Sequence, residues 1–391
     1  MSVVWHLLTG EYPPQRGGVA DYTHLVAHRL AREGERVRVW TRAGSRSSPE
    51  EQDARVCRLP HAYGIRSLAG LGEAIRAAGA TGRLLVQYVP QAFGYGGMNL
   101  AFCLWLACRR EPVWTMFHEV VFPREPRQPA RHRLLAVMTR LMAGVVARAS
   151  ERVFVSTPAW ATILRLIAPD APPAEWLPVP STISPVGDRH DAPSIVRRSG
   201  GSGSRLIGHF GSCGPLIAQQ LAGAIPEVLE HTPDTSMVLI GEGGPALRRR
   251  IVDQCPELAR RLWATGPLSA GDVSAHLLAC DLMLQPFVEG VTTRRTSVMA
   301  ALAHGVPTVT TQGRLTEPLW RTTGAVALAP AGDPAALAAL TSELLAEPGR
   351  RECIGALGRA TYSELFDVRH TIATLCGSGR AIHHVADAGV G

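Results

Sequence analysis

The sequence predicts an α/β protein built from two domains, each with a mostly parallel sheet. Its 391 residues exceed what one hydrophobic core usually supports, and 46% of them are hydrophobic, which is enough for two cores. Strand and helix patterns alternate through the first half, stop in a segment rich in Pro, Gly and Ser, and then start again. We therefore expect βα units on both sides of a linker.

In the first half, short apolar runs predict strands and amphipathic stretches predict helices. The strands are expected at residues 3–8, 36–40, 84–88, 113–117 and 152–155. The helices are expected at residues 21–32, 68–78, 98–109, 131–149 and 159–166.

The second half repeats the alternation after the linker. Strands are expected at residues 206–210, 236–240 and 281–287, and helices at 218–230, 248–255 and 297–304. The predicted organisation is a first domain at 1–185, a flexible linker at 186–205, a second domain at 206–376 and a fraying tail at 377–391. Two Rossmann-like domains would face a cleft.

Charge and composition narrow the classes of partner. The formal net charge is +7, and all 40 of the Lys and Arg residues are arginine. These arginines are scattered and accompany no helix-turn-helix, zinc-finger or aromatic RNA-binding pattern, so a nucleic-acid partner is not expected. Peripheral contact with anionic lipid is left open.

The spacing of the cysteines and the start of the chain indicate the cellular compartment. The eight cysteines form no CxxC pair and no His/Cys metal spacing, which favours reduced thiols. The chain opens directly on the strand-like VVWHLL segment, with no signal-peptide pattern. A cytoplasmic protein is expected.

The segment 281–311 is where we expect the chemistry. A buried strand opens into a loop that carries Glu289, Arg294 and Arg295, and a small-residue helix follows. Helix N-termini at the carboxyl edge of a parallel sheet bind anions, and guanidinium groups grip phosphate oxygens in pairs. A phosphate-rich ligand is therefore predicted. The alternative is a solvated arginine pair at a helix start.

Two sites in the first half also lie at strand ends. Gly17 and Gly18 follow the first strand and precede a helix, where glycine lets a ligand approach the backbone. Structural turns use the same glycine pair, which is the alternative interpretation. His118 ends the strand VWTMF, where an imidazole can bond a sugar hydroxyl or phosphate. Its alternative is a surface histidine beside a loop.

Further glycine-containing strand exits are candidates for lining a nucleotide. They contribute Gly211, Ser212, Gly241, Glu242, Gly266 and Pro267. None of them matches the GxGxxG or GxxxxGK[ST] spacing. The chain also has no DxD pair, HExxH, GxSxG or EF-hand loop, so a metal-dependent or serine-nucleophile mechanism lacks its usual residues. No metal site is expected.

As a set, these segments resemble the bacterial glycosyltransferases of family 4, which have the GT-B fold. The resemblance extends over nearly the whole chain and rests on GEYPPQRGGVADYT, MFHEV, STPAW, WLPVPS and PFVEGVTTRRTSVMAALAHGVPTVTT.

The resemblance implies roles for individual residues. Gly17 and Gly18 match the glycine loop beneath the donor diphosphate and the acceptor, and His118 matches the histidine near the transferred sugar. Glu289 matches the first acidic residue of the Glu-x7-Glu motif, which contacts sugar hydroxyls. The loop Gly290, Val291 and Thr292 would offer N–H groups to phosphate.

The chain departs from the family pattern in two places. Ser297 stands where the second glutamate, the usual ribose contact, is expected, and Glu317 is a candidate substitute. The Arg and Lys that normally follow the first strand of the second domain are also absent, since FGSCGPLIAQQ carries no charge. Arg294 and Arg295 are then the nearest source of positive charge for a diphosphate.

The resulting hypothesis is a retaining, metal-independent glycosyltransferase. It would move a sugar from a nucleoside-diphosphate sugar, bound in the cleft between the domains, to an unknown acceptor. No cofactor is expected, because the nucleotide sugar is a substrate. The alternatives are a nucleotide-sugar epimerase of the same fold and a non-catalytic sugar-nucleotide-binding protein.

Overall fold

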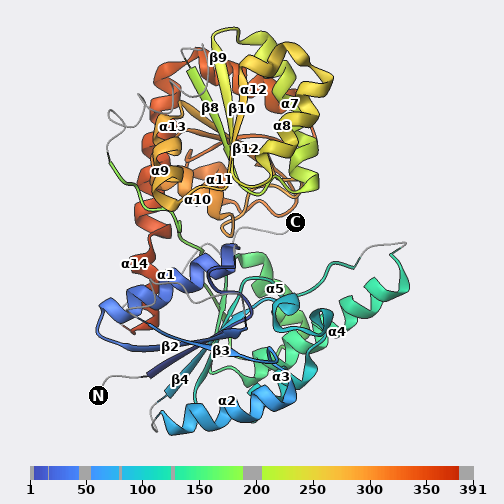
Figure 1. Ribbon diagram of the computed structural model, residues 1–391, viewed down its shortest axis with the longest axis vertical. Helices are drawn as coiled ribbons and strands as arrows, with labels where there is room; N and C mark the ends of the chain where they lie inside the picture. The colour runs from blue at the N-terminus through green and yellow to red at the C-terminus, as the bar shows by residue number, and fades with distance from the viewer. Residues whose placement is uncertain are drawn as a thin grey trace. The chain divides into compact units, whose positions relative to one another are not determined.

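The computed structural model describes residues 4–15, 17–43, 54–78, 82–124, 128–187 and 205–377 (Figure 1). The chain divides into two compact units. The first contains residues up to Pro178 and a return segment that begins at Val368, and the second runs from Val179 to Asp367. Residues 188–204 of the predicted linker and 378–391 of the predicted tail lie outside the described residues.

The first unit is built on a seven-stranded parallel sheet in the order β3-β2-β1-β4-β5-β6-β7. Its strands are β1 (Val4–Thr9), β2 (Arg36–Arg42), β3 (Arg55–Leu59), β4 (Gly82–Tyr88), β5 (Val113–Phe117), β6 (Arg152–Val155) and β7 (Ala174–Trp176). Helices flank this sheet in Figure 1: α1 (Gly18–Arg32), α2 (Ile65–Ala77), α3 (Leu100–Ala107), α4 (Ala130–Ala149), α5 (Pro158–Ile167) and α14 (Val368–Leu375). Two 3₁₀ turns, η1 (Pro90–Phe93) and η2 (Tyr95–Gly97), precede α3.

The second unit has a six-stranded parallel sheet in the order β10-β9-β8-β11-β12-β13. Its strands are β8 (Arg205–Phe210), β9 (Thr235–Ile240), β10 (Leu262–Gly266), β11 (Leu282–Gln285), β12 (Thr308–Gln312) and β13 (Ala327–Pro330). Its α-helices are α7 (Pro215–His231), α8 (Gly244–Gln254), α9 (Ala270–Ala279), α10 (Thr296–Ala303), α11 (Leu319–Thr322), α12 (Pro334–Ala346) and α13 (Pro348–Thr361). A 3₁₀ turn, η3 (Pro256–Arg260), and a π-helical turn, η4 (Tyr362–Phe366), complete it.

The strands that the sequence predicts as apolar runs lie at the centre of each sheet. Every residue of β1 and β9 is buried, because helices cover a parallel sheet on both faces. In the first unit, Phe93 stacks on Phe102 with ring centroids 4.2 Å apart, inside a continuous core. In the second unit, Leu221, Leu239 and Leu284 belong to one buried cluster. The predicted α/β architecture of two parallel-sheet domains is confirmed.

The boundaries of the two units differ from the predicted domains at the C-terminal end. Helix α14 falls within the predicted second domain but packs against α1 of the first unit. The Arg152 Nη1 atom also donates a hydrogen bond to the Thr374 carbonyl oxygen at 3.2 Å. The sequence could not indicate this return, because α14 carries the same helical pattern as the helices before it.

Strand order determines where a ligand can bind in each unit. In an open parallel sheet, ligands bind at the carboxyl ends of the strands where the order reverses direction along the chain. This switch point falls between β1 and β4 in the first sheet and between β8 and β11 in the second.

No helix in the described part of the chain has both the length and the apolarity that crossing a bilayer requires.

Candidate active site

His118 lies next to the switch point of the first sheet, at the end of the strand beside β4. It follows β5, and its backbone N–H donates to the Tyr88 carbonyl at the end of β4. The residue is 6% exposed, its ring Nε2 lies 2.8 Å from Gln87 Oε1, and Tyr22 of α1 meets the ring edge-on with centroids 4.8 Å apart. Burial lowers the pKa of His118 to about 3, so the imidazole is neutral at physiological pH. The structure places His118 in a defined buried setting rather than on an open surface loop.

Gln87 is a neighbour of His118 that the sequence analysis missed. Its side chain is fully buried at the end of β4, and among the described residues its Nε2 has no hydrogen-bond partner. With Oε1 facing His118, the imidazole Nε2–H donates to Gln87 and Nδ1 keeps a lone pair for a ligand hydroxyl. Only the pairing of β4 with β5 could have revealed this contact, since 31 residues separate the two side chains.

The glycine pair lies at the start of α1, beside a carboxylate. Gly18 is the first residue of α1 and Gly17 precedes it. A Cβ on Gly17 would lie 2.7 Å from Glu11 Oε2, so the glycine leaves room for this carboxylate at the helix N-terminus. Burial raises the pKa of Glu11; the charge of Arg42 acts against this shift and that of Glu119 acts with it. The position agrees with the predicted role of Gly17 and Gly18, which stays a prediction.

In the second unit, the glycine-containing strand exits lie against one another. Gly241 pairs with Gly266 in an isolated bridge, and a Cβ on Gly241 would overlap the Gly211 carbonyl oxygen. A Cβ on Gly243 would likewise overlap the Ser212 carbonyl oxygen. Backbone therefore packs directly on backbone at the ends of β8, β9 and β10. Ser212, Glu242 and Pro267 are exposed beside this contact, as a nucleotide-lining role requires.

Glu289 stands in the loop after β11, next to the exit of β8. Its carboxylate pairs with Arg314 and lies 3.7 Å from the Arg294 guanidinium. The Glu289 side chain is 32% exposed, so its oxygens can be reached by a ligand. Arg314, which is largely exposed, was not among the predicted site residues, because it follows β12 and reaches Glu289 only through sheet order.

The backbone around Glu289 is fixed by the loop after β12. Gly290 has a φ of 87°, and a Cβ there would overlap Thr316 Oγ1 and the Gly313 backbone nitrogen. Leu315 N–H donates to the Glu289 carbonyl at 2.9 Å. Glycine at position 290 is thus required both by its φ and by the close approach of the two loops.

The predicted phosphate contacts of this loop need correction at two positions. The N–H of Gly290 donates to the Phe287 carbonyl, and that of Val291 donates to the Thr311 carbonyl at 2.8 Å. The Gly290 bond closes a turn within the loop and the Val291 bond holds the loop against β12, so neither N–H is available to a phosphate. Thr292 differs: its Oγ1 is buried and has no hydrogen-bond partner among the described residues. Thr292 stays a predicted ligand contact.

The two arginines are only partly exposed and have neighbours in the protein, which argues against the alternative of a solvated surface pair. The Arg294 side chain is 19% exposed and faces Glu289. The Arg295 guanidinium lies over the Phe287 ring, 4.4 Å from its centroid. Arg295 is also the N-cap residue of α10, so the backbone of the pair leads directly into a helix start. This concentration of positive charge suits an anion.

Glu317 is hydrogen-bonded to the loop after β11. Its Oε1 accepts hydrogen bonds from the Thr293 N–H and hydroxyl, both at 3.0 Å, and its Oε2 accepts one from Trp320 Nε1 at 2.8 Å. The residue is 5% exposed. These contacts favour a role in holding the loop, and ribose binding by Glu317 stays a prediction. Ser297, at the position of the missing glutamate, points its Oγ toward Gln285 Oε1 at 3.5 Å.

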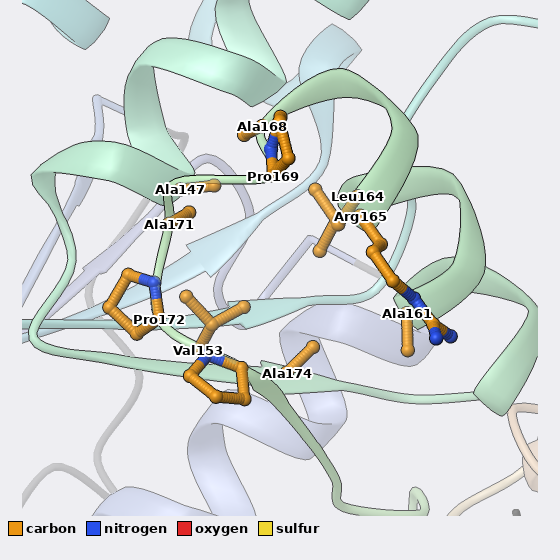
Figure 2. Close-up of a pocket in the computed structure, with 11 residues that line it drawn as sticks. Ala147, Val153, Ala161, Leu164, Arg165, Ala168, Pro169, Ala171, Pro172 and Ala174 are labelled. Atoms are coloured by element: carbon orange, nitrogen blue, oxygen red, sulfur yellow. The ribbon is translucent and has the colours of Figure 1, made fainter.

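A separate cavity lies in the first unit, away from all predicted site residues. It has a volume of about 320 Å³ and is enclosed by α5, the end of α4 and the segment leading into β7. Its lining is mainly Ala, Pro, Val153 and Leu164, with Arg165 at one side (Figure 2).

The described residues include no group of three or more His, Cys, Asp or Glu side chains arranged to hold a metal ion.

Comparison with known proteins identifies the family. Residues 16–172 match the model described as Glycosyltransferase Family 4, and residues 206–347 match that of Glycosyl transferases group 1. The chain belongs to the family 4 glycosyltransferases. The predicted family and enzyme class are therefore confirmed. No curated relative matches the sequence.

Solved structures with the same fold include several sugar-processing proteins. Anabaena Alr3699/HepE in complex with UDP and glucose has a TM-score of 0.73 at 16% identity, with 96% of this chain and 99% of that chain covered. Sucrose-phosphate synthase from Thermosynechococcus elongatus has a TM-score of 0.71 at 18% identity, with coverages of 96% and 97%. A Listeria monocytogenes protein assigned as a UDP-N-acetylglucosamine 2-epimerase has a TM-score of 0.62 at 14% identity, with coverages of 97% and 98%. The GT-B fold of this glycosyltransferase is thus established.

Proposed function

We propose that this glycosyltransferase takes its sugar from a nucleoside-diphosphate sugar, transfers it with retention of anomeric configuration, and needs no metal ion. The observation that carries the proposal is the surroundings of Glu289 in the second unit. There a reachable carboxylate, two arginines and the start of α10 lie at the carboxyl end of β11, beside the glycine exits of β8 and β9. The carboxylate suits sugar hydroxyls, and the cationic groups suit a diphosphate.

The charges in this loop support departure of a diphosphate without a cation. Negative charge develops on the leaving nucleoside diphosphate as the glycosidic bond breaks. Arg294 and Arg295, together with the N–H groups at the start of α10, can stabilise that charge. These two arginines would supply the positive charge that the segment after β8 lacks. Membership of the family supports the proposed retention of anomeric configuration.

The substrates follow from the same chemistry. Solved complexes of HepE contain UDP and UDP-glucose, which supports a nucleotide-sugar donor for this chain. The donor is a substrate, so no separate cofactor is proposed. His118 would accept a hydrogen bond from a hydroxyl of the transferred sugar through Nδ1, because its Nε2–H is bonded to Gln87. The acceptor stays unspecified, and a cytoplasmic location is part of the proposal.

The test is acceptor-dependent release of nucleoside diphosphate. The purified protein is incubated with a panel of nucleotide sugars and acceptor mixtures in excess chelator. We expect one donor to yield nucleoside diphosphate and a glycosylated product whose anomeric configuration, read by NMR, matches the donor. Activity that disappears in chelator and returns with magnesium or manganese would contradict the metal-free mechanism, and an inverted product would contradict retention.

The structural likeness to the epimerase-assigned protein supports a second candidate. An epimerase of this fold would release an altered free sugar in the absence of any acceptor. The same incubation without acceptor separates the two functions. Binding of donor without turnover under either condition would instead favour a non-catalytic sugar-nucleotide-binding protein, which the serine at position 297 would suit.

A further inference from the structure

The cavity in the first unit runs from a buried floor to an exposed mouth. Val153 of β6 and Leu164 of α5 are 1% and 4% exposed, whereas Arg165 and Pro173 are exposed. The volume of about 320 Å³ equals that of about ten water molecules, because each occupies about 30 Å³ in the liquid. The cavity therefore has room for a small organic ligand that is apolar at its inner end.

Small and rigid side chains keep this cavity open. Five of the eleven lining residues are alanine and three are proline. Alanine leaves space that a larger side chain would fill, and proline fixes its own backbone φ. Figure 2 shows Leu164 and Arg165 on one side of the cavity and Pro172 on the other. A ligand would thus enter a preformed apolar space and immobilise few side chains.

Arg165 is the one charged residue among the eleven described residues that line the cavity. The carboxylates that follow it in the chain are paired with other arginines. Asp170 accepts a hydrogen bond from Arg148 Nε at 2.9 Å, and Glu175 accepts one from Arg152 at 2.6 Å. Within the described part of the chain, the Arg165 side chain forms no ion pair or hydrogen bond. Its guanidinium is therefore available to an anion at the mouth of the cavity.

We propose that this cavity binds a small aliphatic monocarboxylate, such as octanoate, with its chain between α5 and the segment before β7 and its carboxylate on Arg165. Octanoate fits in size, with about one non-hydrogen atom for each water volume of the cavity. Burial of the methylene groups favours binding, and the guanidinium orients the carboxylate. A phosphate monoester fits less well, because its charge near −2 would meet a single guanidinium.

Helix α5 connects this cavity to His118. Trp160 Nε1 donates to the His118 carbonyl oxygen at 3.1 Å, and the next residue, Ala161, lines the cavity. Ser156, two residues before α5, donates from its Oγ to the same oxygen at 3.2 Å. A ligand that packs against α5 thus contacts the element that holds the backbone of His118. Occupancy of the cavity is therefore transmitted to the active site, whichever sugar is transferred there.

The test is calorimetric titration of the full chain with octanoate. We expect saturable binding of one octanoate per chain. Octanamide, which lacks the charge, and butanoate, which buries fewer methylene groups, should each bind at least tenfold more weakly. Arg165→Gln and Ala161→Leu should each weaken octanoate binding at least tenfold, because the first removes the cation and the second fills the cavity.

Matched controls lie in the second unit. Arg249→Gln changes an exposed arginine of α8, and Ala339→Leu changes an exposed alanine of α12. Both should bind octanoate like the parent, and circular dichroism should show all variants folded. The site is overturned if the parent binds no octanoate, if octanamide binds as tightly, or if Arg165→Gln and Ala161→Leu bind like the controls.

NMR of the isotopically labelled protein tests the link to the active site. Octanoate should shift the signals of His118 in the parent, with half of the change at the calorimetric dissociation constant. At the same concentration Arg165→Gln should show at most a small fraction of this shift, and Arg249→Gln should show all of it. Signals of His118 that stay unchanged in a saturated parent would overturn the transmission through α5.

Discussion

The imidazole Nε2 of His118 lies 2.8 Å from the side-chain Oε1 of Gln87, and both residues are buried at adjacent strand ends of the first sheet. This contact fixes which ring nitrogen carries the proton. It therefore makes Gln87 a positioning residue for His118, with no ligand contact required of it.

Replacing Gln87 by Leu should remove the contact that selects one tautomer of His118, so that both neutral tautomers are populated. We expect kcat to fall roughly tenfold, which corresponds to the loss of one hydrogen bond worth about 1.4 kcal/mol, while nucleoside diphosphate affinity stays unchanged. Nitrogen NMR of the ring should show a mixture of tautomers. Gln87→Glu should instead raise the pKa of His118, because a carboxylate replaces the amide. An unchanged ring spectrum in both variants would show that Gln87 does not position His118.

Buried histidines should make the protein sensitive to acid. Burial lowers the pKa of His118 to about 3 and that of His209 to about 4, from an ordinary value of 6.5. Between pH 6.5 and 4 the unfolded chain binds protons that the folded chain does not. The stability present above pH 6.5 is therefore lost as the pH falls through this window.

The measurement is the melting temperature at several pH values from 7 to 4. It should fall steadily as the pH falls, and less steeply for His209→Asn. The asparagine amide can still donate to the Leu284 carbonyl, which the His209 Nδ1 contacts at 2.8 Å, but it does not titrate. Parallel curves for parent and variant would show that His209 carries none of this dependence.

Gly290 should tolerate no side chain. Gly290→Ala adds a Cβ at a φ of 87° and against the loop after β12, and both effects are destabilising by about 1 to 3 kcal/mol. The unfolding midpoint in denaturant should drop accordingly. Gly349→Ala is the control, since a Cβ there meets no atom within 4 Å. Equal midpoints for the two variants would mean that the loops around Glu289 are not tightly packed.

Much of this fold could be predicted because hydrophobic period and glycine placement are local signals. The strand Val113–Phe117 was predicted at its observed bounds, and His118 at its strand end follows from it. The short edge strand Ala174–Trp176 was missed, since its residues are only partly buried and lie in a proline-rich segment. Contacts such as Arg314 with Glu289 could not be predicted, because they depend on which strands are neighbours.

Glu289 should serve turnover more than nucleotide binding. Glu289→Gln keeps the size of the side chain but removes its charge and its pairing with Arg294 and Arg314. We expect kcat to fall at least tenfold, by about 1.4 kcal/mol or more, with little change in nucleoside diphosphate affinity. Arg314→Gln is the control for loss of the exposed ion pair alone. Full turnover by Glu289→Gln would exclude a sugar contact.

The central claim is that the loop after β11 binds a diphosphate without a metal, and calorimetric titration of the protein with nucleoside diphosphates in chelator tests it most directly. The parent should bind at least one of them saturably. Arg294→Gln with Arg295→Gln should weaken binding at least tenfold, because charge-assisted hydrogen bonds contribute about 1.5 to 3 kcal/mol each. Lysines at both positions should restore only part of the affinity. Since both side chains are partly buried, melting temperatures must confirm folded variants. A folded double variant that binds as tightly as the parent, or a parent that binds no nucleoside diphosphate, would contradict the claim.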